Sequence, residues 1–279
     1  MYLLFPTIVI AKKFHMTEIS DIPSLPRINE KRVFDSGKRP QAMHYVIGVD
    51  EAGRGPLAGP VVAAAFVILP TRANVFPVSP PSLSNGITDS KQVTESLREF
   101  VYYKKIQPCD MVKYSFSVIS NEVIDEINIL QATFLAMTEA VDALISTIRK
   151  TDPSASFAIL IDGNKVPPQL RDRSDLVCES LIKGDSIEFV IAAASICAKV
   201  ERDHIMHEID TKFPEYGFKQ HKGYGTGGHV AAISKHGPCK HHRMTFAPLK
   251  NIRKNDKPKK KEIPTALSER DLRAMRRGA

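Results

Sequence analysis

Short apolar runs alternate along this chain with longer segments of helical periodicity. Residues 113–119 alternate polar and apolar side chains, which is typical of a half-buried strand. Buried strands are predicted, from apolar runs rich in β-branched residues, at 45–50, 61–69, 157–162 and 176–182. Helices are predicted over 94–106, 121–149, 187–213 and 228–236. Strands interleaved with long helices predict an α/β fold, and the short link after residue 50 makes the first strand pair antiparallel and the sheet mixed.

The two ends of the chain lack this patterning. Residues 1–43 read as a flexible N-terminal extension or a presequence, and prolines and serines at 70–86 predict a loop. We expect one folded domain over residues 44–250, followed by a basic tail over 251–279. No run reaches the roughly 18 apolar residues that a membrane span requires, so no membrane association is expected. The four cysteines are scattered, which argues against a disulfide framework.

The formal net charge of +8 is unevenly distributed. Residues 250–279 hold eleven Lys/Arg against four Asp/Glu, so the tail carries most of the excess. Any phosphate affinity of the folded part must therefore come from local patches. One candidate patch is residues 216–255, which contain no acidic residue. Within that stretch we interpret His221, His241 and Arg243 as packing and polar contacts.

Acidic residues stand at the ends of three predicted elements. Asp50 and Glu51 follow the first strand, Asp162 closes the strand at 157–162, and Asp185 precedes the long helix. Strand ends in α/β folds meet at one crevice, and oxygen ligands suit Mg²⁺ or Mn²⁺. Neighbouring side chains of a strand point to opposite faces, so Asp50 and Glu51 share one site only if the strand ends there. Gly53 and Gly55, close behind, would allow that bend.

Other interpretations of these residues remain open at this stage. Acids at strand ends are also common loop residues, and Asp185 would serve equally as the N-cap of the helix that follows. Two His/Cys groups offer a conceivable zinc site, although no C-x-x-C pair accompanies them. Those residues are His204, His207, Cys239, His241 and His242.

Several blocks of sequence strongly resemble the ribonuclease HII family, in its bacterial single-chain form. They are GVDEAGRGPLAGPVVAAA at 48–65, DSK at 89–91, IDGN at 161–164, KGD at 183–185, IAAASICAKVERD at 191–203, HKGYGTGGH at 221–229 and HGPCKHHRMTF at 236–246. The resemblance implies a ribonuclease H-like fold with a helical C-terminal portion. It also implies an endonuclease that hydrolyses RNA in RNA–DNA hybrids and cuts 5′ to ribonucleotides embedded in duplex DNA.

The resemblance implies roles for individual residues. Asp50, Glu51, Asp162 and Asp185 match the family's four catalytic acids, which hold two divalent ions, Mg²⁺ or Mn²⁺, during catalysis. The cut leaves a 3′-hydroxyl and a 5′-phosphate. Substrate-binding roles fall on Gly53, Arg54, Gly55, Lys91, Lys183 and Tyr224.

Those substrate-binding residues divide by what they would recognise. Gly53, Arg54 and Gly55 suit a 2′-hydroxyl, because glycines let the backbone approach a sugar closely. Tyr224 matches the tyrosine that packs on the deoxyribose just past an RNA-to-DNA junction. Lys91 and Lys183 would contact phosphates, and Arg54 is a further candidate for such a contact. An insertion at residues 171–173 separates Asp162 from Asp185 more widely than is usual in the family.

Two rival functions accompany this prediction. One is another nuclease of the same fold, of the junction-resolvase type, which would also use clustered carboxylates. The other is a non-catalytic protein that binds hybrids. We expect a monomer. Its compartment would be the cytoplasm in a bacterium, or the nucleus or mitochondrion in a eukaryote, where the basic tail or the N-terminal extension would act as a targeting signal.

Overall fold

The computed structural model describes residues 45–69 and 93–251. The predicted N-terminal extension, the loop at 70–86, Lys91 and most of the basic tail lie outside the described residues. The domain boundaries predicted from the sequence stay predictions.

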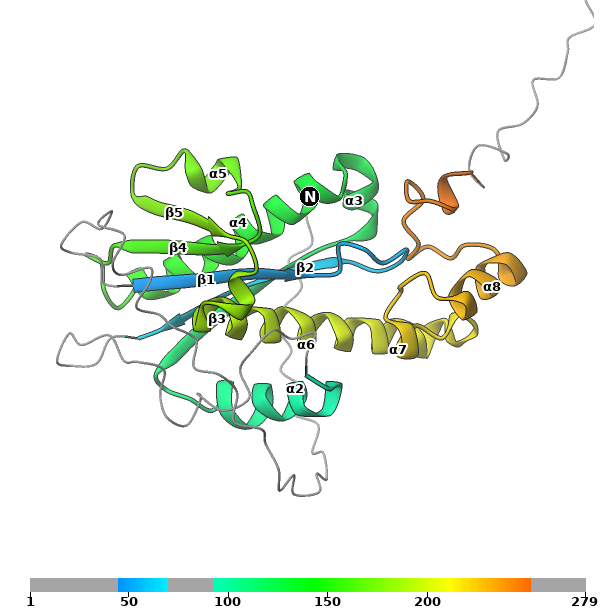
Figure 1. Cartoon of the computed structure of the whole chain (residues 1–279), viewed down its shortest axis with the longest axis horizontal. Helices are drawn as coiled ribbons and strands as arrows, with labels where there is room; N and C mark the ends of the chain where they lie inside the picture. The colour runs from blue at the N-terminus through cyan, green and yellow to red at the C-terminus, as the bar shows by residue number, and fades with distance from the viewer. Residues whose placement is uncertain (1–44, 70–92, 252–279) are drawn as a thin grey trace, which may run out of the picture.

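A five-stranded sheet forms the centre of the described part (Figure 1), in the order β3-β2-β1-β4-β5. The strands are β1 (Tyr45–Ala52), β2 (Val61–Ile68), β3 (Val112–Ile119), β4 (Phe157–Asp162) and β5 (Leu176–Leu181). β2 pairs antiparallel with β1 and β3, whereas β4 pairs parallel with β1 and β5. The predicted mixed sheet and its antiparallel first pair are confirmed.

Helices cover both faces of this sheet. On one face, α4 (Ile129–Arg149) packs against the side of β1 and β2 that carries Ile47, Val49 and Ala63. On the other face, α6 (Phe189–Lys212) packs with α2 (Glu95–Val101) and the π-helical turn η1 (Tyr102–Ile106). A Cβ added to Gly48 would lie 2.2 Å from the backbone of Val190, so only glycine lets α6 come this close to β1.

The helix predicted over 121–149 is two helices, α3 (Asn121–Ile127) and α4. Asn128 separates them because its φ of 69° is left-handed, and its side chain accepts hydrogen bonds from the first N–H groups of α4. α4 is long and apolar enough to cross a membrane by length and composition, but half of that stretch is buried inside the protein. The apolar composition of α4 is therefore that of a core helix that covers the sheet.

A smaller helical portion extends from the second half of α6 (Figure 1). It comprises η3 (Pro214–Tyr216), α7 (Phe218–His221) and α8 (Gly227–His236). These elements share an apolar cluster that includes Leu57, Met206, Phe218 and Ile233. Because Leu57 comes from the turn after β1, this cluster fastens the helical portion to the end of the sheet. The predicted helical C-terminal portion is confirmed.

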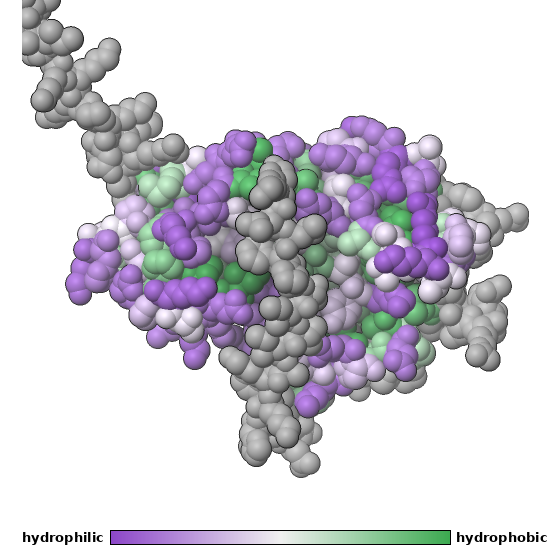
Figure 2. All heavy atoms as spheres, turned by 180° about the vertical axis from the view of Figure 1, so that it is seen from behind, coloured by the Kyte–Doolittle hydropathy of each residue, from purple (hydrophilic) through white to green (hydrophobic). Residues whose placement is uncertain are grey.

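The surface mixes polar and apolar residues (Figure 2). Large hydrophobic side chains are exposed at only a few of the described positions: Met111, Val118, Val177, Ile182, Ile187, Tyr224 and Val230. Tyr224 is the single aromatic residue among them. An exposed ring that does not serve the core is a candidate for contact with a ligand.

Candidate active site

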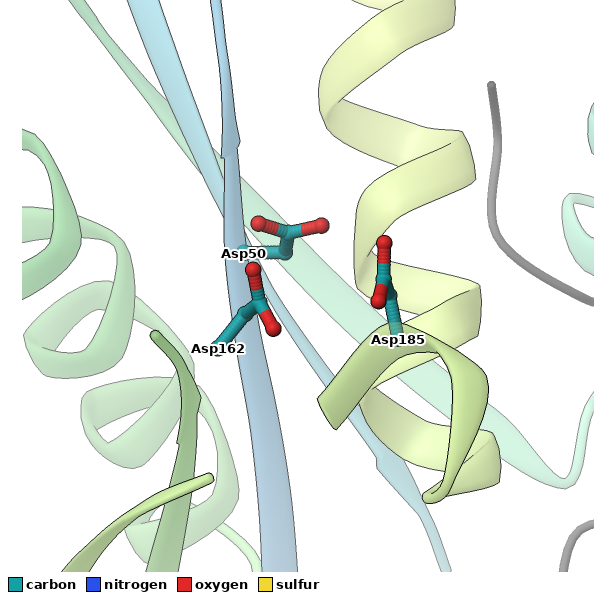
Figure 3. Close-up of side chains that lie close together, drawn as sticks. All are labelled: Asp50, Asp162 and Asp185. Carbon is teal, nitrogen blue, oxygen red and sulfur yellow. The ribbon is translucent and has the colours of Figure 1, made fainter. Parts of the chain in front are cut away.

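Three carboxylates from different elements converge beside the sheet (Figure 3). Asp50 comes from β1, Asp162 from the end of β4, and Asp185 from the short 3-10 turn η2 (Gly184–Ser186). Each offers an oxygen atom, and these oxygens all lie within 4.8 Å of one another. In residues 45–69 and 93–251, no group of this kind includes a histidine or a cysteine.

Strand register explains why Asp50 and Asp162 meet. β1 and β4 are parallel neighbours in which Val49 pairs with Ile161, so the two aspartates occupy the next position of each strand. Side chains alternate between faces, and the preceding Val49 and Ile161 belong to the cluster under α4. Both aspartates therefore point to the α6 side of the sheet.

Asp185 reaches the cluster through the turn between β5 and α6. The Gly184 N–H donates to Asp162 Oδ1 at 2.7 Å, which ties the turn to the end of β4. A Cβ at Gly184 would lie 2.6 Å from Ile191 Cδ1, so glycine permits this close packing. The N-cap of α6 is Glu188, three residues later, and the alternative role of Asp185 as that cap is therefore excluded.

Glu51 is placed differently from the three aspartates. The expectation that the strand ends at Asp50 and Glu51 was wrong: both residues pair with β2, and β1 continues to Ala52. The bend follows at Gly53, whose φ is 100°. Strand alternation thus directs Glu51 to the other face from Asp50, and its Oε1 lies 3.3 Å from Arg54 Nη1.

Burial and like charge make Asp50 costly to ionise. Burial raises the pKa of the Asp50 carboxyl well above its ordinary value, and the negative charges of Glu51 and Asp162 raise it further. Hydrogen bonds from the Glu51 N–H and the Ser195 hydroxyl oppose that rise. Three crowded carboxylates with no sulfur or nitrogen ligand suit a hard divalent cation, which would offset the repulsion. The oxygen donor set therefore fits Mg²⁺ or Mn²⁺.

Two buried arginines hold the loop that follows β1. Arg202, on α6, donates to the carbonyls of Ala58 and Pro60 at 3.2 and 3.0 Å. Arg243 donates to the Gly53 carbonyl at 2.6 Å and to the Arg54 carbonyl at 3.1 Å, and also reaches the carbonyls of Gly59 and Pro60. Neither side chain is exposed, and burial lowers the pKa of Arg243 to about 9.

Tyr224 lies against this same loop. A Cβ added to Gly55 would lie 3.6 Å from Tyr224 Cε1, so glycine leaves open space beside the ring. The Leu57 N–H donates to the Gly223 carbonyl at 2.8 Å and joins the two loops. The Tyr224 residue is 46% exposed. The fold therefore brings Gly55 and Tyr224 together although 169 residues separate them in the sequence.

The remaining predicted residues divide by exposure. Arg54 and Lys183 are exposed near the acids, with Lys183 directly preceding η2. In the acid-free stretch, Lys222 is buried and bonded to Glu95, and Arg243 serves the loop. The predicted packing role of Arg243 is confirmed. In the described part of the stretch, residues 216–251, the exposed cations are Lys219, Lys235, Lys240 and Lys250.

Sequence reasoning did not single out Arg202. Nothing in its spacing distinguishes it from the surface arginines, because its partners are carbonyls more than 140 residues away. One signal could have drawn attention to Arg202: it lies on a long helix that is otherwise rich in buried small residues.

Comparison with known proteins gives consistent matches. The sequence model of the Ribonuclease HII family matches residues 47–249. The chain is 46% identical over 205 residues to ribonuclease HII of Xanthomonas axonopodis pv. citri, which covers 74% of this chain and 75% of that protein. It is 45% identical over 219 residues to ribonuclease HII of Endomicrobium trichonymphae, covering 78% of this chain and 93% of that one.

Among solved structures, ribonuclease H2 from Pyrococcus horikoshii superposes with a TM-score of 0.57 at 26% identity, covering 76% of this chain and 98% of that one. Bst-RNase HIII in complex with Mn²⁺ superposes with a TM-score of 0.55 at 21% identity, covering 78% and 72%, a likeness of fold alone. The fold is ribonuclease H-like, as predicted. By family match and by identity to curated relatives, this chain belongs to the ribonuclease HII family and is a ribonuclease, a hydrolase of phosphodiesters.

Proposed function

We propose that this enzyme cuts the RNA strand of RNA–DNA hybrids and cuts duplex DNA on the 5′ side of an embedded ribonucleotide, leaving a 3′-hydroxyl and a 5′-phosphate. The observation that carries this proposal is the convergence of Asp50, Asp162 and Asp185 within 4.8 Å. The loop that follows β1, the strand that carries Asp50, lies against Tyr224. The residues proposed for hydrolysis are therefore followed directly by the loop proposed for sugar recognition.

The three aspartates and Glu51 would hold the metal. Two divalent ions, Mg²⁺ or Mn²⁺, would make a water molecule nucleophilic at neutral pH and stabilise the leaving 3′ oxygen. The Gly184 N–H orients Asp162, and the Ser195 hydroxyl orients Asp50. Glu51 pairs with Arg54, and its charge acts on Asp50; we assign it to the metal site from the sequence.

The choice of sugar falls to the neighbouring loop. Gly55 is exposed and leaves space for a ribose to approach the backbone, where amide groups can recognise its 2′-hydroxyl. Gly53 packs against Arg202, and its φ of 100° provides the bend that presents this backbone. The Tyr224 ring packs on the next sugar and leaves no room for a second 2′-hydroxyl. Arg54 and Lys183, both exposed, contact phosphates, and we assign Lys91 the same role from the sequence.

The substrates are RNA–DNA hybrids and ribonucleotide-containing DNA, which the enzyme binds as a monomer. The curated relatives named above are bacterial, and we propose the cytoplasm as its compartment.

The direct test uses a duplex with one embedded ribonucleotide and the same duplex with deoxyribose at that position. We expect one cut, 5′ to the ribonucleotide, only when Mg²⁺ or Mn²⁺ is present. Cutting of the all-deoxy duplex would favour a nuclease of the junction-resolvase type. Binding without cutting at any metal concentration would favour a hybrid-binding protein. Either result would overturn the proposal.

A further inference from the structure

A continuous run of hydrogen bonds through two buried histidines ends at the backbone of Tyr224. The Cys239 N–H donates to His242 Nδ1 at 2.9 Å. The two ring Nε2 atoms of His242 and His229 lie 3.1 Å apart, and His229 Nδ1 lies 2.9 Å from the Tyr224 carbonyl. Both histidines are buried, at 0% and 1% exposure, and they come from α8 and from the turn that follows it.

The partners assign the ring protons. The Tyr224 carbonyl can only accept, so His229 Nδ1 carries a proton. His242 Nδ1 lies 2.9 Å from the Cys239 nitrogen, which donates, and 3.2 Å from the Cys239 carbonyl oxygen, which accepts. We assign Nδ1 as the acceptor in the shorter contact, so a neutral His242 bears its proton on Nε2 and donates it to the bare Nε2 of His229. Every bond in the run is then satisfied with both rings neutral.

The surroundings of the pair favour neutral rings. His221 stacks on His229 with ring centroids 4.3 Å apart, and Phe218 and Tyr216 pack against the pair. The other titratable neighbours are Cys239 and His241, and none of these groups carries a carboxylate. Burial lowers the pKa of His229, and burial followed by the neighbouring His229 lowers that of His242 to about 4.

Tyr224 depends on these bonds because glycines flank it. Gly223 has a left-handed φ of 82°, and neither Gly223 nor Gly225 restricts the backbone through a side chain. The Tyr224 N–H donates to the His221 carbonyl at 2.9 Å, and its carbonyl accepts from the Thr226 N–H at 2.8 Å as well as from His229. The direction of the exposed ring therefore follows from backbone bonds, and His229 supplies the one that comes from a side chain.

We propose that His229 and His242 act as positioning residues for Tyr224: as a neutral pair they fix its backbone so that the ring rejects a ribose at the junction. This inference rests on the proposed role of Tyr224. Neither histidine touches the substrate. The pair links α8 to the backbone of Tyr224 and so sets the position of the ring. Removing the hydrogen bond from His229 should weaken sugar discrimination, while metal binding at the aspartates persists.

Two variants of one residue test the pair, since the asparagine amide can reproduce the Nδ1 donor of a histidine. The junction preference is the cleavage rate on the single-ribonucleotide duplex divided by the rate on an all-RNA hybrid of the same sequence. H229F, which removes the donor, should lower this preference by about tenfold. H229N should restore most of it. H236F, on the last residue of α8, is the control and should leave the preference unchanged.

Tyr224→Ala, measured alongside, separates this inference from the proposed function. If Tyr224→Ala lowers the preference and H229F does not, the positioning role is wrong while the role of Tyr224 stands. If Tyr224→Ala has no effect, both are wrong. Mn²⁺ binding to each variant should match that of the unsubstituted protein; a loss in H229F would indicate a general structural defect and overturn the inference.

The unsubstituted protein provides a second test that needs no variant to fold. The ¹⁵N chemical shifts of histidine ring nitrogens report which nitrogen bears the proton. We expect His229 to carry it on Nδ1 and His242 on Nε2 at pH 7. A charged ring, or the opposite tautomer of His229, would contradict the inference.

Discussion

The aspartate cluster (Asp50, Asp162 and Asp185) and the Tyr224 loop (residues 223–225) are held in place by different kinds of contact. Asp50 and Asp162 occupy matching positions of two paired strands, so backbone ladders and an apolar core position them. Burial of the Asp50 carboxylate is unfavourable by itself, and the like charges of Glu51 and Asp162 add to that cost. The Tyr224 loop and the loop at 53–60 lie outside the sheet. A few backbone bonds join them, such as Leu57 N–H to the Gly223 carbonyl, and the buried side chains of Arg243 and His229 donate to their carbonyls.

This difference predicts which property a substitution in each region should change. The aspartate cluster fits a divalent cation, which the chain itself does not supply. The negative charge of the three carboxylates is what such a cation would offset. The Tyr224 loop and the loop at 53–60 are held by donors within the chain, His229 for the first and Arg243 for the second. Substitutions in the cluster should therefore affect the rate of hydrolysis, and substitutions around the loop should affect stability and the choice of sugar.

The largest effect is expected from removing one charge of the cluster. Asp162→Asn should lower the cleavage rate by roughly 10³-fold, about 4 kcal/mol of transition-state stabilisation, because a metal-binding carboxylate is lost. Steady-state cleavage of the single-ribonucleotide duplex measures it. Asp175→Asn, on an exposed carboxylate paired with Arg149 and Arg173, is the matched control and should keep its rate. A normal rate for Asp162→Asn would exclude that aspartate from catalysis.

A smaller effect, on the stability of the whole domain, is expected when the loop at 53–60 loses the buried guanidinium of Arg243. Arg243→Gln leaves several buried carbonyls without a donor and should reduce the free energy of unfolding by about 3 kcal/mol or more. Urea unfolding followed by circular dichroism measures the change. Arg171→Gln, on an exposed arginine paired with Asp172, should change it little. Equal stabilities for the two variants would show that the four carbonyl contacts of Arg243 contribute nothing.

The histidine pair makes stability depend on pH. The pKa of His242 is about 4 in the folded protein, below its ordinary value of 6.5, because the ring is buried beside His229. The unfolded chain therefore takes up the proton first. The contribution of His242 to stability is complete above pH 6.5 and is lost as pH falls towards 4, by up to roughly 3 kcal/mol. Unfolding free energies between pH 7 and 4 should fall less steeply in H242Q; identical slopes would contradict this.

The smallest effect is expected at the insertion between Asp162 and Asp185. Arg173 pairs there with Asp142 on α4 and with Asp175, largely at the surface. Arg173→Ala should cost less than about 1 kcal/mol of unfolding free energy and leave cleavage unchanged, since surface ion pairs contribute little. Thermal unfolding and the duplex cleavage assay check both points. A large fall in cleavage would show that the insertion positions Asp185.

Much of this site could be predicted from the sequence where secondary structure decides the geometry. The strand ends placed Asp50 and Asp162, and the turn after β5 placed Asp185. The end of β1 was misplaced, because the pairing of Glu51 with Ala63 depends on β2 and not on the local sequence. The break at Asn128 was missed for the opposite reason, since apolar spacing continues across it.

The arrangement around the loop could not be predicted from the sequence. Arg243 meets Gly53 across 190 positions, and His229 meets His242 through ring nitrogens whose protons depend on the fold. No periodicity encodes such contacts, because each joins a side chain to a carbonyl or ring that only tertiary structure brings near. The resemblance to ribonuclease HII suggested the proposed role of Tyr224, but the contacts of its backbone with His221 and His229 became visible only in the structure.

The most direct test of the account compares Asp50→Asn with Tyr224→Ala on two substrates, the single-ribonucleotide duplex and an all-RNA hybrid, under single-turnover conditions. The account predicts that Asp50→Asn slows both reactions by the same large factor and leaves their ratio unchanged. It predicts that Tyr224→Ala lowers the ratio by about tenfold. A ratio altered by Asp50→Asn, or unaltered by Tyr224→Ala, would contradict the division of labour between the aspartate cluster and the Tyr224 loop.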